Sequence, residues 1–263
     1  MRVALGGVPE TLLWTLYQRA AEARRTDAVL RDPWAVGLAD SIDFPYAERF
    51  GPPRLAQWQA LRAACFDHEV RRFLARRPGG RVVALGEGLE TQYWRVDDGR
   101  VRWLTVDVPD AVELRQALLP RSERQELLAG SAFDQAWLER VDPEAEVLVT
   151  AQGLLMYFEP DAVHGLLARC LAALPRATLV FDAFPHWLAL LNANADPSGG
   201  YRPPPWHWSL DRREERRLRA HGRLRRLRLP RGRGPAFGLG LPLMERVPLI
   251  DDWRYSVFRL QAR

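Results

Sequence analysis

The first region of the chain, up to about residue 77, carries apolar residues at the spacing of helix faces. One stripe contains Leu12, Leu13, Leu16, Tyr17 and Ala20. The segment 31–34 interrupts this pattern because it contains a proline, which cannot continue a helix from within. A longer stretch with overlapping apolar stripes follows over residues 54–77. The pattern predicts a group of helices over residues 1–77.

Beyond residue 78, short apolar runs alternate with helical patterns. The runs predict strands at residues 81–85, 101–106, 146–151 and 178–182, and the helical patterns predict helices at 109–119 and 161–174. This alternation of strand and helix is typical of a parallel sheet with helices on both faces. We therefore expect an α/β fold with a doubly wound, Rossmann-like sheet whose core spans residues 78–182.

The alternation stops at residue 183. Residues 183–209 are rich in proline, glycine and tryptophan, and a long insertion of this kind in a compact fold is often a lid or a binding loop. Residues 211–228 predict a charged helix, and the apolar runs at 242–250 and 253–260 predict an antiparallel strand pair that completes the sheet. We divide the single domain 1–263 into N-terminal helices (1–77), core (78–182), lid insertion (183–222) and C-terminal strands (223–263).

Composition excludes several classes of protein. A chain of 263 residues with 47% hydrophobic residues can bury one large core. Cys65 and Cys170 lie in separate helical patterns, so we expect neither a disulfide framework nor a metal cluster. No run of 18 apolar residues is present and the N-terminus does not resemble a signal peptide. These features predict a cytoplasmic protein that does not span a membrane.

The positive charge of the chain comes from arginine alone. The sequence contains no lysine, so all 38 basic residues are arginine, and catalysis through a lysine Schiff base is excluded. An arginine-rich segment at 212–233 begins among Asp211, Glu214 and Glu215, which favours a solvated helix face. Nucleic-acid binding through these arginines is the alternative, and it predicts an affinity that falls steeply with salt.

The most informative motif follows the strand predicted at 81–85. That strand ends at Gly86-Glu87-Gly88, and Asp107 ends the next predicted strand about 20 residues further on. A Gly-x-Gly turn lets a ligand approach the backbone, and the acid is placed to bind ribose hydroxyls. Thr91 stands where the third glycine of a dinucleotide site would fall, so the turn suits a nucleoside better than a pyrophosphate. A nicotinamide-dependent oxidoreductase remains an alternative.

Several further blocks, in the right order, resemble the leucine carboxyl methyltransferase family, and most of all its bacterial branch of tetracenomycin-type polyketide O-methyltransferases. The blocks are 10–13, 31–33, 85–95, 106–109, 130–134 with Trp137, and 151–157. Together they cover roughly residues 8–182. The resemblance implies a class I methyltransferase that uses S-adenosyl-L-methionine, releases S-adenosyl-L-homocysteine, needs no metal and carries a helical lid.

The resemblance also implies the residues that hold the methionine end of this cofactor. They are Arg62, Gly86, Glu87, Gly88, Gln152 and Gly153. Arg62 corresponds to an arginine that binds the cofactor carboxylate, for which a planar bidentate donor is well suited. Gln152 stands where the family carries an acid, so one negative charge facing the cofactor ammonium is absent. An amide oxygen can still accept a hydrogen bond there, although a cofactor binder without turnover is a further alternative.

The nucleoside end is implied at the tips of the next strands. Asp107, followed by Val108, corresponds to the ribose-binding acid, while Ser131 and Ala132, followed by Phe133, correspond to the residues that recognise adenine. Ser131 stands where the eukaryotic relatives carry Asp. Adenine recognition would therefore rest on backbone amides or on Asp134.

The acceptor is expected under the lid insertion. The aromatic residues Trp187, Tyr201, Trp206 and Trp208 would suit a flat apolar acceptor. His207 and Tyr157 are candidate catalytic residues, with local packing as the alternative role of each. A carboxylate acceptor is ionised at pH 7 and needs no base, whereas a phenol does.

We therefore predict an O-methyltransferase that acts on a carboxylate or an acidic phenol of a small aromatic or polyketide-like metabolite. The small-molecule acceptor is the only partner expected. Neither a membrane nor a nucleic acid is expected as a partner, and the sequence predicts no oligomeric state.

Overall fold

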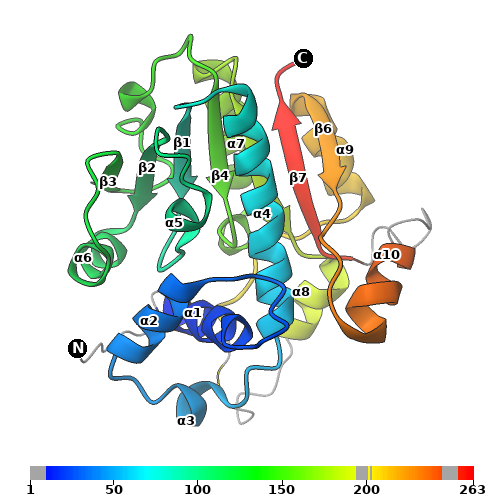
Figure 1. Ribbon diagram of the computed structural model, residues 1–263. Helices are drawn as coiled ribbons and strands as arrows, with labels where there is room; N and C mark the ends of the chain where they lie inside the picture. The colour runs from blue at the N-terminus through cyan, green and yellow to red at the C-terminus, as the bar shows by residue number, and fades with distance from the viewer. Residues whose placement is uncertain (1–9, 194–200, 202, 245–253) are drawn as a thin grey trace.

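A seven-stranded sheet forms the centre of the computed structural model, which describes residues 10–193, 201, 203–244 and 254–263 (Figure 1). Its strands are β1 (Arg81–Leu85), β2 (Arg102–Asp107), β3 (Gln125–Ala129), β4 (Val147–Ala151), β5 (Thr178–Ala183), β6 (Arg223–Leu227) and β7 (Ser256–Gln261). They lie in the order β3-β2-β1-β4-β5-β7-β6. Strands β1 to β5 are parallel, and β7 runs antiparallel to both of its neighbours. The predicted fold class is confirmed.

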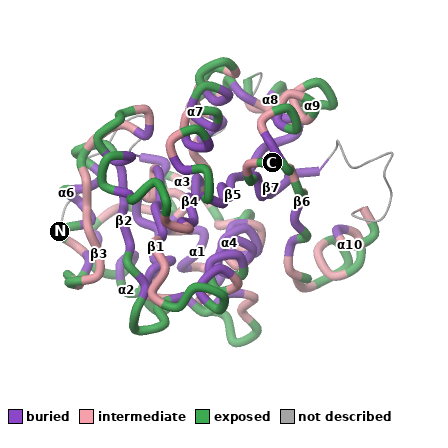
Figure 2. Tube along the Cα trace, turned by 90° about the horizontal axis from the view of Figure 1, so that it is seen from above, coloured by how far each residue is buried: buried purple, intermediate pink, exposed green. Residues whose placement is uncertain are grey.

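Helices cover both faces of the sheet and gather at one edge of it. They are α1 (Glu10–Ala23), α2 (Pro33–Ser41), α3 (Tyr46–Phe50), α4 (Ala56–Arg76), α5 (Gln92–Val96), α6 (Pro109–Leu118), α7 (Pro160–Ala173), α8 (His186–Ala193), α9 (Arg212–His221) and α10 (Leu241–Met244). Helix α4 crosses one face, and α7 and α9 cover the other. Seen from above, buried strands run between helices whose outer sides are exposed (Figure 2). Helices α1 and α2 sit beyond the edge where the parallel strands end (Figure 1).

Local sequence explains where two of these helices begin. Asp32 precedes α2 and accepts a hydrogen bond from the backbone N–H of Ala35 at 3.0 Å, and Pro33 occupies the first helical position. Asp211 caps α9 in the same way through the N–H of Glu214 at 2.7 Å. The interruption predicted at residues 31–34 is therefore the start of a new helix.

The strands predicted at 81–85, 101–106, 146–151 and 178–182 are found to within one residue. Strand β3 was not predicted. Its residues Gln125 and Glu126 are polar, and it lies half-buried at the edge of the sheet, where one side remains open. A strand that buries little apolar surface carries only a weak hydrophobic signal.

The prediction of one charged helix over residues 211–228 is wrong. Helix α9 ends at His221, and β6 follows directly after Gly222. A Cβ atom on Gly222 would lie 2.1 Å from the carbonyl oxygen of Gln261, so only glycine lets β6 start this close to β7. The strand predicted at 242–250 is also wrong over its described part, because α10 runs to Met244; residues 245–250 lie outside the described residues.

The segment 183–222 is not one lid. Helix α9 packs against α7, and its Leu218 belongs to the hydrophobic core. Trp208, expected in the lid, is fully buried in that core, and its indole N–H donates to Glu214 at 3.0 Å. The acceptor-binding role predicted for Trp208 is therefore corrected to core packing. Residues 194–200 and 202 of the segment lie outside the described residues.

No helix in the described part of the chain is both long and apolar enough to cross a membrane.

A chain of polar groups joins α7 to α9. The Nδ1 atom of His164 lies 2.8 Å from Nε2 of His221, and its Nε2 atom lies 2.9 Å from a carboxylate oxygen of Glu214. The two imidazole rings are stacked, with centroids 5.1 Å apart. A hydrogen bond between two imidazoles requires one of them to be neutral. Burial, followed by the neighbouring His164 and Arg217, lowers the pKa of His221 from 6.5.

This arrangement predicts that the folded state loses stability in acid. Because the folded state disfavours the charged form of His221, stability is highest above pH 6.5 and falls as the pH drops below that value. In His221→Gln, the decrease in thermal midpoint between pH 7 and pH 5 should be smaller than in the parent. His68→Gln, at an exposed position, is the control. An unchanged slope in His221→Gln would contradict this assignment.

Candidate active site

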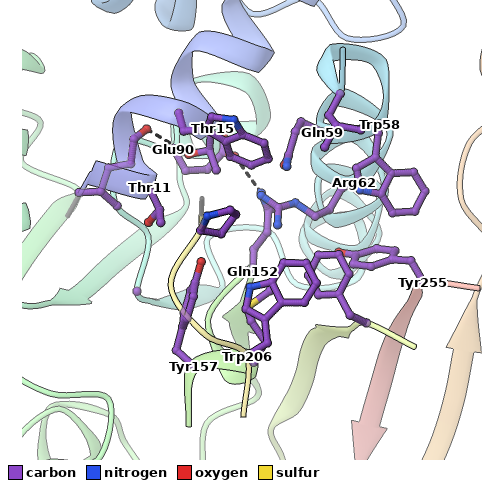
Figure 3. Close-up of a pocket in the computed structure, with 18 of the residues that line it drawn as sticks. Thr11, Thr15, Trp58, Gln59, Arg62, Glu90, Gln152, Tyr157, Trp206 and Tyr255 are labelled. Carbon is purple, nitrogen blue, oxygen red and sulfur yellow. Dashed lines mark hydrogen bonds between the residues drawn. The ribbon is translucent and has the colours of Figure 1, made fainter. Parts of the chain in front are cut away.

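A cavity of about 680 Å³ opens at the edge where the parallel strands end, underneath helix α1. Its polar lining includes Thr11 and Thr15 of α1, Gln59 and Arg62 of α4, Glu87 and Glu90 after β1, and Gln152 and Gly153 after β4. Its aromatic lining includes Trp14, Trp58, Tyr157, Phe184, Trp187, Tyr201, Trp206, Phe237 and Tyr255. Figure 3 shows Arg62 and Gln152 reaching into the same space, with Tyr157, Trp206 and Tyr255 on one side of it. This is the edge where open α/β sheets bind ligands.

Arg62 is held at the cavity by Asp182, the penultimate residue of β5. Its Nη1 atom lies 3.5 Å from a carboxylate oxygen of Asp182, which is fully buried. The other carboxylate oxygen accepts the backbone N–H of Gly153 at 2.7 Å, and the hydroxyl of Tyr255 donates to the same carboxylate. Burial and the nearby carboxylate raise the pKa of Tyr255, which keeps this hydroxyl protonated. Nε of Arg62 has no hydrogen-bond partner.

Gly153 cannot be replaced by a larger residue without moving Arg62. Its φ is 68°, a conformation that favours glycine, and a Cβ atom there would lie 2.7 Å from Nη1 of Arg62. The turn after β4 therefore approaches the guanidinium group as closely as a backbone can.

Glu90 and Gln152 form a second polar contact on the cavity wall. The side-chain amide nitrogen of Gln152 donates to Glu90 at 2.9 Å, and the amide oxygen of Gln152 has no partner. Glu90 also accepts from Arg95 at 2.6 Å and lies 3.4 Å from a guanidinium nitrogen of Arg19. Although burial alone raises it, Arg19 and Arg95 hold the pKa of Glu90 at about 2, so the group is ionised.

The glycine-rich turn after β1 is held in place by the carboxylates of Asp107 and Glu87. Asp107 accepts the N–H groups of Gly88 and Val108 at 2.7 and 2.8 Å. Glu87 lines the cavity, but its carboxylate accepts from the side chains of Trp103 and Thr105, and a guanidinium nitrogen of Arg115 lies 3.1 Å away. Glu87, predicted at the cofactor, lines the cavity; its Oε2 atom is hydrogen-bonded to Trp103 and Thr105, whereas its Oε1 atom has no hydrogen-bond partner among the described residues.

The predicted cofactor residues fall into two groups. Arg62, Gly86, Glu87, Gln152 and Gly153 line the cavity. Gly88, in the turn after β1, lies outside it, as do Asp107, Val108, Ser131, Ala132 and Phe133 along the ends of β2 and β3. Those two strands are paired in register at Asp107 and Ala129, so both groups share one edge of the sheet.

Local contacts shape the loop after β3. The N–H of Ser131 donates to Asp134 at 2.6 Å, and the carbonyl of Ala132 accepts from the indole of Trp137 at 2.9 Å. The ring of Phe133 packs edge-on against Phe158 with centroids 4.7 Å apart. The side chain of Asp134 is thus already hydrogen-bonded within its own loop.

Some of the residues expected to bind the acceptor line the cavity, and others do not. Trp187, Tyr201 and Trp206 line the cavity, and Trp206 stacks on Phe184 with centroids 4.2 Å apart. His207 does not line it. Its side chain is 47% exposed and Nδ1 lies 3.0 Å from a carboxylate oxygen of Glu159. The prediction of His207 as a catalytic base is therefore not supported by its position.

Tyr157 does line the cavity. Burial raises the pKa of its hydroxyl, which disfavours the phenolate that a general base would require. No group of three or more metal-ligating side chains occurs within the described residues.

Sequence reasoning missed several polar residues of this site, among them Gln59, Glu90, Asp182 and Tyr255. Asp182 carried a signal, because it ends a predicted strand at the same edge as Asp107. Gln59 lies one turn before Arg62 on the same helix, so the helical pattern could have paired them. Tyr255 reaches the cavity only because β7 returns antiparallel beside β5, which no local pattern reveals.

Comparison with known proteins places the chain in context. Residues 13–171 match the family described as leucine carboxyl methyltransferase. The chain is 34% identical over 186 residues to the tetracenomycin polyketide synthesis O-methyltransferase TcmP of Streptomyces glaucescens, covering 70% of this chain and 69% of that protein. It is 32% identical over 185 residues to the S-adenosyl-L-methionine-dependent methyltransferase dpfgK of Gibberella zeae, covering 64% and 62%.

A solved structure supports the fold alone. The crystal structure of a DUF574 family protein from Streptomyces avermitilis superposes with a TM-score of 0.55 at 13% identity, covering 95% of this chain and 97% of that one. At this identity the likeness extends to the arrangement of strands and helices only.

The contact between Asp182 and Arg62 predicts a large loss of stability on removing the acid. Asp182→Ala leaves a buried guanidinium without its carboxylate, and should lower the free energy of unfolding by about 3–5 kcal/mol. Chemical denaturation measures this change. Asp161→Ala is the control, because Asp161 pairs with Arg217 but is 92% exposed, and should cost at most about 1 kcal/mol. Equal small losses would show that Asp182 does not hold Arg62.

Proposed function

Because the chain belongs to the leucine carboxyl methyltransferase family, we propose that it methylates an oxygen atom of a small acceptor bound in the cavity beside S-adenosylmethionine. The chain is an S-adenosylmethionine-dependent methyltransferase, as TcmP is an O-methyltransferase and dpfgK is S-adenosylmethionine-dependent by description. The chemical class of the acceptor is the part that we infer from the cavity.

The residues at the polar end of the cavity fit the amino acid end of the cofactor. Arg62 presents an unpartnered Nε atom and is suited to bind a carboxylate with two parallel hydrogen bonds. The turn at Gly86 has a φ of 60°, and a Cβ atom there would lie 2.5 Å from the side chain of Leu154, so glycine alone keeps this approach open. Asp107, Ser131 and Ala132 lie on the same edge and would hold the nucleoside.

The cofactor supplies an activated methyl group when bound. The residues of the chain therefore have to align the acceptor oxygen with that group and exclude water. The aromatic rings on the other side of the cavity serve both tasks. Trp206 and Phe184 form a stacked pair, and Trp58 packs edge-on against Tyr255 with centroids 4.7 Å apart. Flat apolar walls of this kind suit an aromatic or polyketide-like acceptor.

The proposal for the acceptor rests on the acidic and basic groups that line the cavity. No histidine is among the described residues that line it. Its two glutamates, Glu87 and Glu90, are held in ion pairs with arginine, and the tyrosines Tyr157, Tyr201 and Tyr255 have raised pKa values. Burial raises the pKa of Glu87, but the carboxylate oxygen of Glu87 that is bonded accepts from Trp103 and Thr105 and pairs with Arg115. None of the other groups is poised to remove a proton near pH 7. The acceptor must arrive ionised, which favours a carboxylate first and an acidic phenol second.

The alternative of nucleic-acid binding has little support from the arginine-rich segment. Arg217, Arg219 and Arg226 pair with the carboxylates of Asp161 and Glu215, which reduces the charge available to phosphates. Beyond β6, Arg233 pairs with Glu22 and Asp27. The other arginines of α9 and β6 are exposed, away from the cavity with its aromatic residues.

Binding of S-adenosylmethionine tests the cofactor site first. The parent should bind S-adenosylmethionine and S-adenosylhomocysteine in a calorimetric titration and should not bind NAD. Asp107→Ala should cost about 1.5–3 kcal/mol of binding free energy, because a charged hydrogen-bond partner of the ribose is lost. Asp110→Ala, at an exposed position on α6, should bind like the parent. Saturable NAD binding with no heat from S-adenosylmethionine would contradict the assignment.

Transfer kinetics test the acceptor site. Trp206→Ala should leave the affinity for S-adenosylmethionine nearly unchanged and sharply reduce transfer of a radiolabelled methyl group to aromatic carboxylic acids, because one wall of the cavity is removed. His207→Ala should reduce transfer little, since His207 lies outside the cavity. The rate of the parent should vary little between pH 6 and pH 8, where a carboxylate stays ionised. A collapse of transfer in His207→Ala with intact cofactor binding would instead indicate a base and a phenolic acceptor.

A further inference from the structure

We propose that Glu90 is a positioning residue that turns the amide oxygen of Gln152 toward the cavity, so that Gln152 accepts the ammonium group of the cofactor and Glu90 supplies the compensating negative charge from behind. The proposal rests on the proposed cofactor site and assigns a role to Glu90, a residue of the cavity wall to which the resemblance gave none.

The hydrogen bond between the two side chains fixes the orientation of the amide. Glu90 is ionised and can only accept, so it must face the NH₂ group of Gln152, which lies 2.9 Å away. The oxygen of the same planar amide then points in the opposite direction. That oxygen is buried and has no partner, and Gln152 lines the cavity that also contains Arg62 (Figure 3). An unpaired buried acceptor is costly unless a ligand donates to it.

The buried charged groups around this contact carry a net negative charge on the side of the cavity where Gln152 lies. The buried set consists of the guanidinium groups of Arg19 and Arg95 and the carboxylates of Asp32, Asp67 and Glu90. Three carboxylates against two guanidinium groups leave one negative charge, and only Arg71, half exposed and 3.9 Å from Asp67, approaches from solvent. Arg62 pairs with Asp182 and also interacts electrostatically with Glu90. The cavity thus offers a cation for a carboxylate and, across from it, a negative region for an ammonium.

The same geometry explains why a neutral residue occupies position 152. A carboxylate there would face the carboxylate of Glu90 at about the distance of the present hydrogen bond, and two like charges so close cannot both stay ionised. Glutamine keeps the acceptor oxygen and avoids the repulsion. The negative charge therefore lies on Glu90, which contacts the ligand-binding residue Gln152. Arg19 and Arg95 keep Glu90 ionised.

Calorimetric titration of Gln152→Glu tests the inference, because the inference predicts weaker binding of S-adenosylmethionine. The variant should bind S-adenosylmethionine about tenfold or more weakly than the parent, since a charged hydrogen bond is replaced by a repulsive pair. The loss should grow as the pH is raised. Affinity for 5′-methylthioadenosine, which has no amino acid end, should stay within about twofold. Gln116→Glu on the exposed face of α6 controls for added charge.

Together with Gln152→Glu, the variants Glu90→Gln and Glu90→Gln/Gln152→Glu form a double-mutant cycle. The single Glu90→Gln variant should bind S-adenosylmethionine more weakly, and moving the acid to position 152 should restore most of that loss, with a coupling of about tenfold or more. If Glu90→Gln fails to fold because Arg19 and Arg95 lose their partner, Gln152→Met provides a second test of the same inference. It should weaken S-adenosylmethionine but not 5′-methylthioadenosine.

Three outcomes would overturn the inference. They are tighter or unchanged binding of S-adenosylmethionine by Gln152→Glu, parallel losses for S-adenosylmethionine and 5′-methylthioadenosine, and additive effects in the cycle. Absence of S-adenosylmethionine binding by the folded parent would instead refute the proposed cofactor site, so the two failures are distinguishable.

Discussion

The need to pair buried charges determines how the N-terminal helices meet the sheet. Arg95 of α5 donates to Asp32 at the start of α2, to Asp67 of α4 and to Glu90 in the glycine-rich turn. Removing any one of these ions from water costs several kcal/mol unless its partners are in place. The helices α1, α2 and α4 and the turn after β1 must therefore assemble together. The cavity lies beside this network, and two of the network's charged residues, Arg19 and Glu90, line it.

The sequence reveals the parts of the fold that depend on local patterns. Strands β1, β4 and β5 are fully or almost fully buried, so their apolar runs are continuous and easy to recognise. Asp32 followed by Pro33 marks a helix start for reasons of hydrogen bonding and backbone geometry alone. The resemblance assigns Arg62, Gly86 and Gln152 one by one to the expected methionine end, and the structure brings these three residues to one cavity.

Other features depend on contacts between distant segments and leave little local signal. The arginines and leucines of β6 follow a charged helix, and only pairing with β7 makes them a strand. His207 and Trp208 look equivalent in the aromatic run, yet one faces solvent and the other the core. Backbone N–H groups of both residues donate to the carbonyl of Met156, and this anchoring decides the direction of each side chain. Asp182 and Tyr255 meet only because β5 and β7 are neighbours.

The central claim is that the charged end of the cavity holds the amino acid end of the cofactor and the aromatic end holds the acceptor. A crystal structure of the complex with S-adenosylhomocysteine tests this most directly. The account predicts the ligand carboxylate within hydrogen-bond distance of Arg62, the ammonium at the amide oxygen of Gln152, and the space beside Trp206 left free for an acceptor. A nucleoside bound between Trp206 and Tyr255, with Arg62 still paired only to Asp182, would contradict it.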